Sequence, residues 1–471
     1  MISLTLHEIA ATVGGRLTDE STGGTRVSGS VQTDSRLVTA GSIFFAMPGE
    51  EADGHDFIPQ AIAAGAALVV AERAVDVPVP TIVVENGVAA LADLAREVVA
   101  RVRAGGRLEV VAVTGSNGKT TTKNMLRAIL GAHGPTVGPD GSFNNHVGAP
   151  ITMLRVDEST RYLVVEMGAS HTGEIAHLVS IARPDVGIVL AVGRAHVGEF
   201  GGVDVIARAK AEMVVELPDT ATAVLNSDDR RVAAMATQTA AGISWFGRDE
   251  GSGLRAWNVV SSLAGTTFDL VVDGRIVAVK LQIVGEHHAM NALAALSAAR
   301  VLGVDTGAAI AALEAMPRAE RWRMELLASP AGAVIINDAY NASPESAAAA
   351  LHALAAVRPG GSRSVAVLGE MTELGATADD EHAAIGDLAA RLGIDRLVVV
   401  GPRARAIHNA VVASVGWAGA ADFVQNADDA YRLLDGEIGP DDVVLVKSSK
   451  SANLRFLGDR LAGIADRKSV V

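Results

Sequence analysis

A glycine-rich turn that carries one lysine stands between an apolar run and a helical pattern. Residues 115–120, Gly-Ser-Asn-Gly-Lys-Thr, directly follow the strand-like run VVAVT. Glycines allow backbone N–H groups to point at an anion, the lysine can reach β- and γ-phosphates, and a threonine at the helix start can bind Mg²⁺. The turn therefore predicts a nucleoside triphosphate site. Its plainer interpretation is an ordinary strand–turn–helix connection, and the general phosphate-loop pattern has a glycine where this chain has Val113.

Three further side chains could complete a metal site beside this turn. Glu166 ends the apolar run YLVVE, and His196 follows the next apolar run, VGIVLAVG. Ligands of open α/β sheets bind beyond the carboxyl ends of the strands, so both side chains are expected near the turn. Lys210 lies on a helical pattern at 203–217. Taken alone, these residues are a solvated carboxylate, a structural histidine and a surface lysine.

The elements that must position these residues follow an α/β rhythm. Apolar runs at 162–168, 186–193 and 221–229 alternate with helical patterns, which is typical of a mostly parallel, doubly wound sheet. Residues 257–284 alternate differently around a DG turn, which predicts an antiparallel hairpin. The last third of the chain repeats the rhythm as a smaller Rossmann-like sheet. The first hundred residues, with short strands and helices, indicate a small α/β domain.

Length and punctuation predict three domains. The chain has 471 residues, against a usual length of about 150 per domain. Charged stretches containing Gly or Pro divide it near residues 105 and 318. The predicted fold class is α/β, with a central P-loop-type, mostly parallel sheet, a C-terminal Rossmann-like domain and a small N-terminal α/β domain. The expected ranges are 1–105, 106–318 and 319–471.

Composition excludes several classes of function. The 40 basic and 54 acidic side chains give a net charge of −14, which argues against broad binding of nucleic acid or of anionic membranes. The chain has no cysteine, so disulfides, thiolate nucleophiles and cysteine-bound zinc are excluded. The longest apolar runs are shorter than the roughly 20 residues of a membrane span, and the first residues lack the layout of a signal peptide. These features predict a soluble cytoplasmic protein.

The ordered motifs of the central segment resemble those of the Mur ligase superfamily. They are TGSNGKTTTK, EMGAS, GRAHVGEFGG, AKAEM, LNSDD and GEHHAMNALAA. This family, which includes folylpolyglutamate synthase-like enzymes, joins a carboxylate to an amine at the expense of ATP. Its phosphate loop has the short form TGxNGKT, so Val113 agrees with the resemblance.

The resemblance implies nucleotide, metal and catalytic roles. The residues implied to bind ATP are Thr114, Gly115, Ser116, Asn117, Gly118, Lys119, Thr120, Thr121, Asn226, His287, Asn291, Arg323 and Asp338. The residues implied to hold Mg²⁺, as two ions, are Thr120, Glu166, His196 and Lys210, and several family members carry that lysine as a carbamate. Lys119, Lys210 and His196 are the implied catalytic residues. His288 stands where many relatives have asparagine, and Arg321 is the alternative to Arg323.

Motifs at the two ends of the chain imply the substrates. Segments 336–347, 368–375 and 142–150 resemble those of the family branch that adds D-alanyl-D-alanine, and TDSR (33–36) with 42–57 resembles the region that binds a UDP-muramoyl substrate. The residues implied to contact these substrates are Asp34, Ser35, Arg36, Asn144, Asn145, Tyr340 and Asn341. The implied reaction is ATP + UDP-N-acetylmuramoyl-tripeptide + D-alanyl-D-alanine → UDP-N-acetylmuramoyl-pentapeptide + ADP + phosphate, by a monomeric enzyme of peptidoglycan synthesis.

Some alternatives stay open at this point. The amine could be that of a sister ligase, such as diaminopimelate. The chain could also be a folylpolyglutamate synthase-like ligase, or a P-loop switch protein that ligates nothing. The Asp34-Ser35-Arg36 segment could be no more than a capped turn. KSSK (447–450) departs from the KGSR of relatives, and a lysine at its last position loses the bidentate recognition of a carboxylate that arginine provides.

Overall fold

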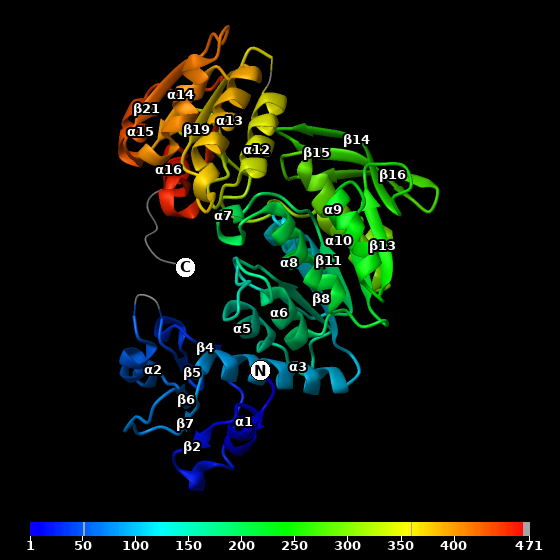
Figure 1. Cartoon of the computed structure of the whole chain (residues 1–471), viewed down its shortest axis with the longest axis vertical. Helices are drawn as coiled ribbons and strands as arrows, with labels where there is room; N and C mark the ends of the chain where they lie inside the picture. The colour runs from blue at the N-terminus through cyan, green and yellow to red at the C-terminus, as the bar shows by residue number, and fades with distance from the viewer. Residues whose placement is uncertain (50–51, 359, 465–471) are drawn as a thin grey trace.

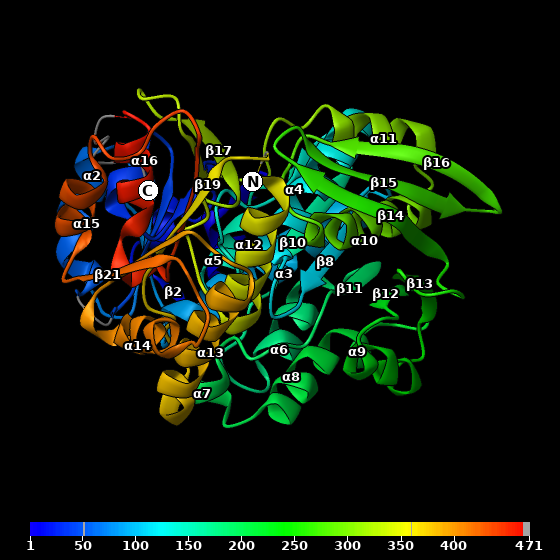
Figure 2. The ribbon, with the colours of Figure 1, turned by 90° about the horizontal axis from the view of Figure 1, so that it is seen from above.

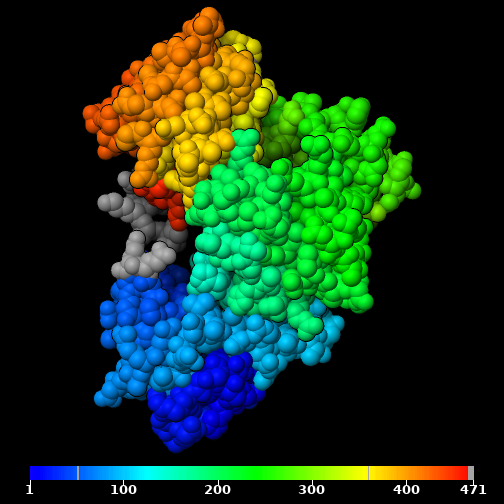
Figure 3. All heavy atoms as spheres, in the orientation of Figure 1, coloured from blue at the N-terminus to red at the C-terminus, as the bar shows by residue number. Residues whose placement is uncertain are grey.

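The computed structural model describes residues 1–49, 52–358 and 360–464, in which three regions follow one another along the long axis of the molecule (Figure 1). Their main sheets have five, nine and six strands. The N-terminal and C-terminal regions lie at opposite ends, with the central region between them (Figure 3). Glu50 and Glu51, inside the 42–57 motif, and residues 465–471 of the predicted third domain lie outside the described residues.

The N-terminal region is a small α/β layer. Its sheet has the order β2-β7-β6-β5-β4 and is parallel except for β2, while β1 pairs with β3 separately. Its elements are β1 (Leu4–Thr5), α1 (Leu6–Thr12), β2 (Arg16–Leu17), β3 (Arg26–Val27), β4 (Val31–Gln32), β5 (Ile43–Ala46), α2 (Ile58–Ala63), β6 (Leu68–Ala71), β7 (Thr81–Val83) and α3 (Gly87–Ala104).

Helix α3 connects this region to the next through a shared hydrophobic core. It begins where the Asn86 side chain accepts a hydrogen bond from the Ala89 N–H at 2.8 Å, and its apolar face is buried along the whole length. That face packs against α5 and α6 of the central region. Buried residues of both regions, such as Ile43 and Ile175, belong to one cluster, so these two regions form one continuous core.

The central region is built on a nine-stranded sheet of order β16-β15-β14-β13-β12-β11-β8-β10-β9. Its elements are β8 (Glu109–Thr114), α4 (Lys119–His133), β9 (Thr136–Val137), α5 (Gly148–Met153), β10 (Tyr162–Glu166), α6 (Glu174–Ala182), β11 (Val186–Val189), α7 (Val197–Phe200), α8 (Val203–Val215), β12 (Thr222–Asn226), α9 (Arg230–Ala234), β13 (Gly242–Gly247), β14 (Leu254–Ser262), β15 (Gly265–Val272), β16 (Arg275–Leu281), α10 (His287–Val301) and α11 (Thr306–Glu314).

Two parts of this sheet match two different sequence patterns. From β9 to β14 the strands are parallel. Strands β14 to β16 are antiparallel and extend away from the rest of the molecule when it is seen from above (Figure 2). The β15–β16 turn holds Asp273 and Gly274 at φ of 49° and 72°, the left-handed values that a tight hairpin turn requires. The hairpin predicted at 257–284 is confirmed.

The place of β8 in this sheet positions the candidate site. The strand β8 lies between β11 and β10, and helices cover both faces, with α4 and α10 on one side and α5, α6 and α8 on the other. The strands β9 and β10, which follow β8 in the chain, lie on one side of it, and the strands from β11 to β16 lie on the other side. Such a switch point leaves a crevice beyond the carboxyl ends of the strands, where ligands of doubly wound sheets bind.

The C-terminal region is a six-stranded sheet of order β17-β18-β22-β19-β20-β21, parallel except for β17. Its elements are β17 (Glu325–Ala328), β18 (Val334–Asn337), α12 (Pro344–Val357), β19 (Arg363–Leu368), α13 (Ala378–Arg391), β20 (Arg396–Val400), α14 (Arg405–Ala413), β21 (Ala420–Val424), α15 (Ala427–Leu434), β22 (Asp442–Lys447) and α16 (Leu454–Leu461). Apolar clusters fill both of its faces.

These three sheets confirm the predicted α/β fold class. The predicted boundaries near residues 105 and 318 lie between α3 and β8 and between α11 and β17, and their status as domain limits stays a prediction. Among the helices of the described residues, none is both long enough and apolar enough to cross a membrane.

Candidate active site

A cleft of about 700 Å³ lies where the central region meets the C-terminal region. The predicted site residues that line it are Ser116, Asn117, Gly118, Lys119, Thr120, Thr121, Asn144, Asn145, Glu166, His196, His287, Asn291, Arg323, Asp338, Tyr340 and Asn341. The predicted residues outside its lining are Thr114, Gly115, Lys210, Asn226, Asp34, Ser35 and Arg36. The fold thus brings most of the predicted nucleotide, metal and amine-side residues into one space.

The glycine-rich turn forms the floor of this cleft. Gly118, directly before α4, has φ 85°, and a Cβ atom there would lie 2.4 Å from Oδ1 of Asn291 on α10. Only glycine therefore fits this left-handed position beneath the asparagine. The Ser116 hydroxyl accepts a hydrogen bond from the Gly193 N–H at 2.9 Å, which joins the turn to the segment after β11. The first residues of α4 line the cleft, and the N–H groups of a first helical turn have no partner within the helix, as an anion site needs.

The Lys119 ammonium lies across this turn. Its Nζ donates to the Gly115 carbonyl at 2.6 Å and to the Ser116 carbonyl at 3.4 Å. Burial lowers the pKa of Lys119, with Arg323 adding to the effect and the Glu166 carboxylate opposing it. A partly buried cation whose hydrogen bonds go to carbonyls alone is weakly compensated, so an anionic phosphate would be a better partner for it.

Oxygen ligands for a divalent cation meet beside Lys119. The Thr120 hydroxyl lies 3.3 Å from Glu166 Oε1, which also accepts from the Asn144 amide at 2.8 Å. Glu166 is 1% exposed, and within the described residues its Oε2 has no hydrogen-bond partner. A buried carboxylate oxygen without a partner is costly. Hydroxyl and carboxylate oxygens are also the ligands that Mg²⁺ prefers, so these residues fit such an ion.

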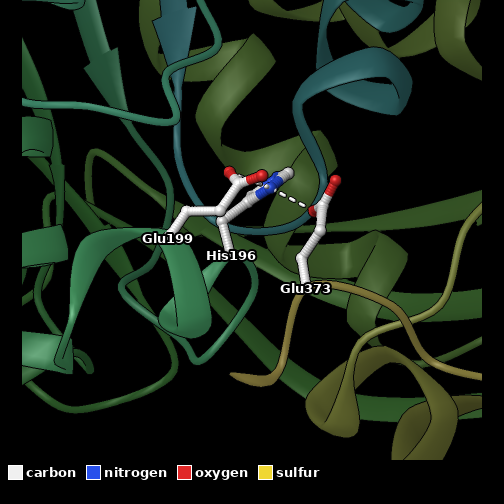
Figure 4. Close-up of side chains that lie close together, drawn as sticks. All are labelled: His196, Glu199 and Glu373. Atoms are coloured by element: carbon white, nitrogen blue, oxygen red, sulfur yellow. Dashed lines mark ion pairs between the residues drawn. The ribbon is translucent and has the colours of Figure 1, made fainter.

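His196 lines the cleft and points toward Glu373 of the C-terminal region (Figure 4). Its Nδ1 pairs with the Glu373 carboxylate and lies 3.6 Å from Glu199 Oε2. The hydrogen bond with the His196 ring lowers the pKa of Glu373. The Gly198 N–H donates to the Glu373 carbonyl at 2.9 Å. Here His196 links two regions of the molecule, and its role as a ligand of a second Mg²⁺ stays a prediction.

Lys210 is buried within α8 rather than exposed on its surface. It is 2% exposed, and its Nζ lies 5.8 Å from the centre of the Phe200 ring. Burial, with a smaller contribution from Lys119, lowers the pKa of Lys210 to about 7. The surface-lysine interpretation is therefore wrong. An amine with this pKa is partly neutral, and hence nucleophilic, near pH 7.

The residues predicted for the nucleotide side divide into two kinds. His287 and Asn291 line the cleft, and Asn291 Nδ2 lies 3.2 Å from Nδ1 of the buried His288. Asn226 instead donates to the Leu190 carbonyl at 2.8 Å and accepts from the Asp228 N–H at 3.0 Å. Thr114 donates to the Met167 carbonyl at 2.8 Å. These last two side chains fasten neighbouring strand ends together beneath the cleft.

The C-terminal wall of the cleft contains a buried ion pair. Lys447 Nζ lies 2.7 Å from Asp338 Oδ2 and donates to the Asn341 carbonyl at 2.8 Å. Both side chains are largely buried. Lys447, the first residue of the KSSK segment and the one that matches the KGSR of relatives, is thus part of the site wall.

The first serine of the same segment has a structural explanation. Ser448 stands where relatives have glycine, and it is fully buried. A Cβ atom on Gly369 would lie 2.8 Å from the Ser448 Cβ. Since Gly369 has no side chain, it leaves room for the serine.

The segment between the central and C-terminal regions carries Arg323. Arg323 Nη2 lies 3.5 Å from the Thr120 hydroxyl, and its guanidinium lies over the Tyr340 ring at 4.6 Å. Arg321 instead pairs with Asp459 at 2.9 Å. The neighbours Trp322 and Met324 have φ of 58° and 49°, left-handed values that cost about 1–3 kcal/mol each outside glycine. Of the two arginines, the geometry favours Arg323 at the site.

The Asp34-Ser35-Arg36 segment lies in the N-terminal region, outside this cleft. Asp34 begins a short 3₁₀ turn by accepting from the Arg36 N–H at 2.9 Å, and the Arg36 guanidinium pairs with the same carboxylate. Ser35 donates to Gln60 at 3.0 Å. The capped turn of the plainer interpretation is therefore present, and binding of a UDP-muramoyl substrate there stays a prediction.

Several residues of the site were not identified from the sequence. Glu373 contacts His196, Lys447 pairs with Asp338, and the Ser343 hydroxyl donates to Asn117 Oδ1 at 3.2 Å across the cleft. Glu373 and Ser343 lie inside motifs that the sequence did mark, 368–375 and 336–347. The motifs were a usable signal for these two, whereas nothing in the sequence links Lys447 with Asp338.

Comparison with known proteins confirms the resemblance that the sequence motifs indicated, over nearly the whole chain. Three protein-family models match successive stretches of the chain. The model described as "Mur ligase family, catalytic domain" matches residues 28–108, and the "Mur ligase middle domain" matches residues 113–299. The "Mur ligase, glutamate ligase domain" matches residues 322–450. The chain is 43% identical to the UDP-N-acetylmuramoyl-tripeptide–D-alanyl-D-alanine ligase of Mycobacterium tuberculosis, over 98% of each chain.

Solved structures give the same result. The fold is similar to the crystal structure of MurF from Acinetobacter baumannii, with a TM-score of 0.88, 30% identity and coverage of 98% of this chain and 99% of the other. It is also similar to the MurF ligase of Thermotoga maritima in complex with ADP, with a TM-score of 0.80, 29% identity and coverage of 94% and 99%. The chain belongs to the Mur ligase family.

Proposed function

We propose that this chain uses ATP to join D-alanyl-D-alanine to UDP-N-acetylmuramoyl-tripeptide, forming the pentapeptide precursor of peptidoglycan. The observation that carries the proposal is the shared cleft. The phosphate turn with Lys119, Thr120 and Glu166 opens onto Asp338 and Tyr340 of the C-terminal region. ATP and an amine substrate held by these two walls would lie within reach of each other.

The identity of the substrates is supported by the relatives. The Mycobacterium tuberculosis relative and a relative of Escherichia coli, 35% identical over 87% of this chain, are both named UDP-N-acetylmuramoyl-tripeptide–D-alanyl-D-alanine ligases. A folylpolyglutamate synthase of Mycobacterium tuberculosis is 17% identical and therefore supports the fold alone. The names favour the dipeptide as the amine over the diaminopimelate or folate alternatives.

The proposed chemistry activates a carboxylate that is otherwise a poor electrophile. An oxygen of the acceptor carboxylate attacks the γ-phosphorus of ATP, the bond to the β–γ bridging oxygen breaks, and an acyl phosphate and ADP form. The dipeptide amine then attacks the acyl carbon, loses a proton and expels phosphate as the peptide bond forms. Lys119 and the N–H groups at the start of α4 would stabilise negative charge on the transferring phosphoryl group.

The C-terminal wall would keep water away from the acyl phosphate. Ser343 bonds to Asn117, and the Arg194 backbone N–H donates to Glu345 at 2.9 Å, so the C-terminal region already touches the phosphate side of the cleft. Such coverage protects an intermediate that water would hydrolyse. The predicted hinges near residues 105 and 318 are part of this proposal.

We also propose two Mg²⁺ ions and a carbamate on Lys210. Thr120 and Glu166 would hold the first ion, and His196 and Lys210 would serve the second. Bound Mg²⁺ would neutralise charge on the phosphates. The neutral amine of Lys210 would attack CO₂, form an N–C bond and release a proton, which turns a cation into an anionic oxygen ligand. The unpaired Glu166 Oε2 and the lowered pKa of Lys210, about 7, support this arrangement.

The remaining parts of the proposal concern the setting. ATP and a nucleotide-linked acceptor are cytoplasmic metabolites, so we place the reaction in the cytoplasm. We propose that the enzyme acts as a monomer, because residues of one chain build both walls of the cleft.

Phosphate release with a panel of amines tests the proposal. The enzyme is given ATP, Mg²⁺ and UDP-N-acetylmuramoyl-tripeptide with D-alanyl-D-alanine, D-alanine or diaminopimelate. Turnover is expected with the dipeptide and not with the free amino acids. The assignment is wrong if a free amino acid supports turnover and the dipeptide does not. ATP hydrolysis that no amine stimulates would favour the switch-protein alternative.

A further inference from the structure

The C-terminal helix α16 carries a buried carboxylate that holds the segment beside Arg323. Asp459 is 8% exposed. Its oxygens accept hydrogen bonds from the Trp322 indole N–H at 3.0 and 3.1 Å, from Arg321 Nη2 at 2.9 Å and from Asn337 Nδ2 at 3.2 Å. Asp459 is outside the lining of the cleft, so it does not contact a substrate bound there.

The segment that Asp459 holds has an unusual backbone. Trp322 and Met324 are both left-handed, on either side of Arg323. Non-glycine residues keep such values only where the surroundings enforce them. The Trp322 N–H donates to Glu325 at 2.9 Å, and the Met324 N–H donates to Asp338 at 3.0 Å. The indole bond to Asp459 adds the side-chain restraint to these two backbone restraints.

This backbone decides where the two arginines point. Arg321 is turned toward Asp459, whereas Arg323 reaches the Thr120 hydroxyl and the Tyr340 ring. In an extended strand, two side chains that are two residues apart would lie on the same face, but the left-handed Trp322 between the two arginines turns them in different directions. A change in the Trp322 conformation would therefore move the Arg323 guanidinium away from the phosphate turn.

We infer that Asp459 is a positioning residue, which holds Trp322 so that Arg323 is aimed at the phosphate turn. The inference rests on the proposed use of ATP at this cleft. It couples a helix near the C-terminus to Thr120 through Trp322 and Arg323. Small displacements of a positioned charge can reduce turnover by large factors, so the effect should appear in catalysis rather than only in stability.

A double-mutant cycle tests this coupling in the full-length enzyme. Asp459→Asn, Arg323→Ala and the double variant are compared with the wild type for kcat/KM with ATP and for MgATP affinity. We expect a loss in kcat/KM of about tenfold for Asp459→Asn and about a hundredfold for Arg323→Ala. The double variant should be no worse than Arg323→Ala, because both changes remove the same interaction.

Two further variants separate positioning from folding. Trp322→Phe keeps the ring and removes the indole N–H, so it should lower kcat/KM about threefold with an unchanged unfolding midpoint. This variant decides the matter if Asp459→Asn does not fold. The matched control is Asp442→Asn, since Asp442 is a similarly buried carboxylate, paired with Arg363 at 2.8 and 2.9 Å. It begins β22 at the end of the strand opposite to Lys447 and is outside the lining of the cleft. Its kcat/KM should stay at the wild-type value.

Additive losses in the cycle would overturn the inference, as would wild-type kcat/KM in both Asp459→Asn and Trp322→Phe. A loss equal to that of Asp442→Asn would mean that Asp459 acts through stability alone. Failure of the proposed function is distinguishable, because in that case the wild type itself lacks turnover with the tripeptide and dipeptide. The MgATP affinities of the wild type and the three variants can then still be compared in the double-mutant cycle.

Discussion

The two walls of the cleft are built in different ways. On the central side, Lys119 is held by carbonyls three and four residues before it in the chain. On the C-terminal side, Asp338 is held by Lys447, and Arg321 by Asp459, over sequence separations of 109 and 138 residues. The phosphate side is thus positioned by one compact motif, whereas the other side depends on strands and a helix that come together only in the folded region.

This difference has a consequence for mutation. A substitution of Lys119 should remove chemistry and leave the fold intact, because this side chain donates only to carbonyls within its own turn. A substitution on the C-terminal wall should affect turnover and stability together, because its side chains are buried and paired. Measurements of activity and of unfolding on the same variants can therefore distinguish the roles of the two walls.

The largest expected effect comes from Lys119→Ala. Loss of the ammonium should reduce phosphate release about 1000-fold, since it removes a group that stabilises charge in phosphoryl transfer. The free energy of unfolding should stay near the wild-type value or rise, because a partly buried, weakly compensated cation is removed. Steady-state phosphate assays and denaturant unfolding measure the two quantities. Residual activity above one tenth of wild type would contradict this role.

Lys210→Ala should have the next largest effect, about a hundredfold loss of activity. Added formate or acetate should restore part of it by supplying the missing carboxylate oxygens. Wild-type activity should fall as pH drops below about 7, because the amine then takes a proton and no longer reacts with CO₂. In the rescued variant this particular fall should be absent. A variant with full activity would remove Lys210 from the mechanism.

Lys447→Met tests the C-terminal wall. It leaves the Asp338 carboxylate without its buried partner, which should destabilise the protein by about 3 kcal/mol. Turnover should fall about tenfold, because Asp338 also accepts from the Met324 N–H beside Arg323. Urea unfolding and phosphate release on the same preparations provide both values. Unchanged stability together with lost activity would mean that this wall is as self-contained as the phosphate turn.

The smallest expected effect is that of Glu373→Gln. The His196–Glu373 pair joins the two walls, but its side chains are 28% and 41% exposed, and such pairs contribute less than about 1 kcal/mol. We expect the KM for ATP to rise about threefold with kcat nearly unchanged. Glu199→Gln, on the same side as His196, is the matched control. A tenfold change in kcat would place Glu373 directly in the chemistry.

The contrast between the walls also explains what the sequence could predict. The fold class, the parallel core and the 257–284 hairpin follow from local periodicity and turn residues, and the structure confirms them. The turn with Lys119 and Thr120 and the strand end with Glu166 could be located because strand order brings such ends to one edge. Here the relevant information lies within a few residues.

Long-range pairs could not be predicted in the same way. Lys447 looked like part of a departing loop, and only the register of β22 beside β18 brings it against Asp338. Asn226 lies within a nucleotide-side motif, yet its amide and carbonyl are both occupied by backbone groups. The choice between Arg321 and Arg323 depends on two left-handed backbone conformations, which no side-chain pattern reveals.

The low aromatic content of the chain gives Trp322 a practical value. The chain has four tryptophans, and this one lies between the Tyr340 and Phe456 rings, with cationic side chains at 4.8 and 5.6 Å. Nearby charges and rings shift the emission wavelength and yield of an indole. Intrinsic fluorescence should therefore report movement of the segment that carries Arg323, without an attached dye, and a Trp322→Phe difference spectrum would isolate that signal for ligand screening.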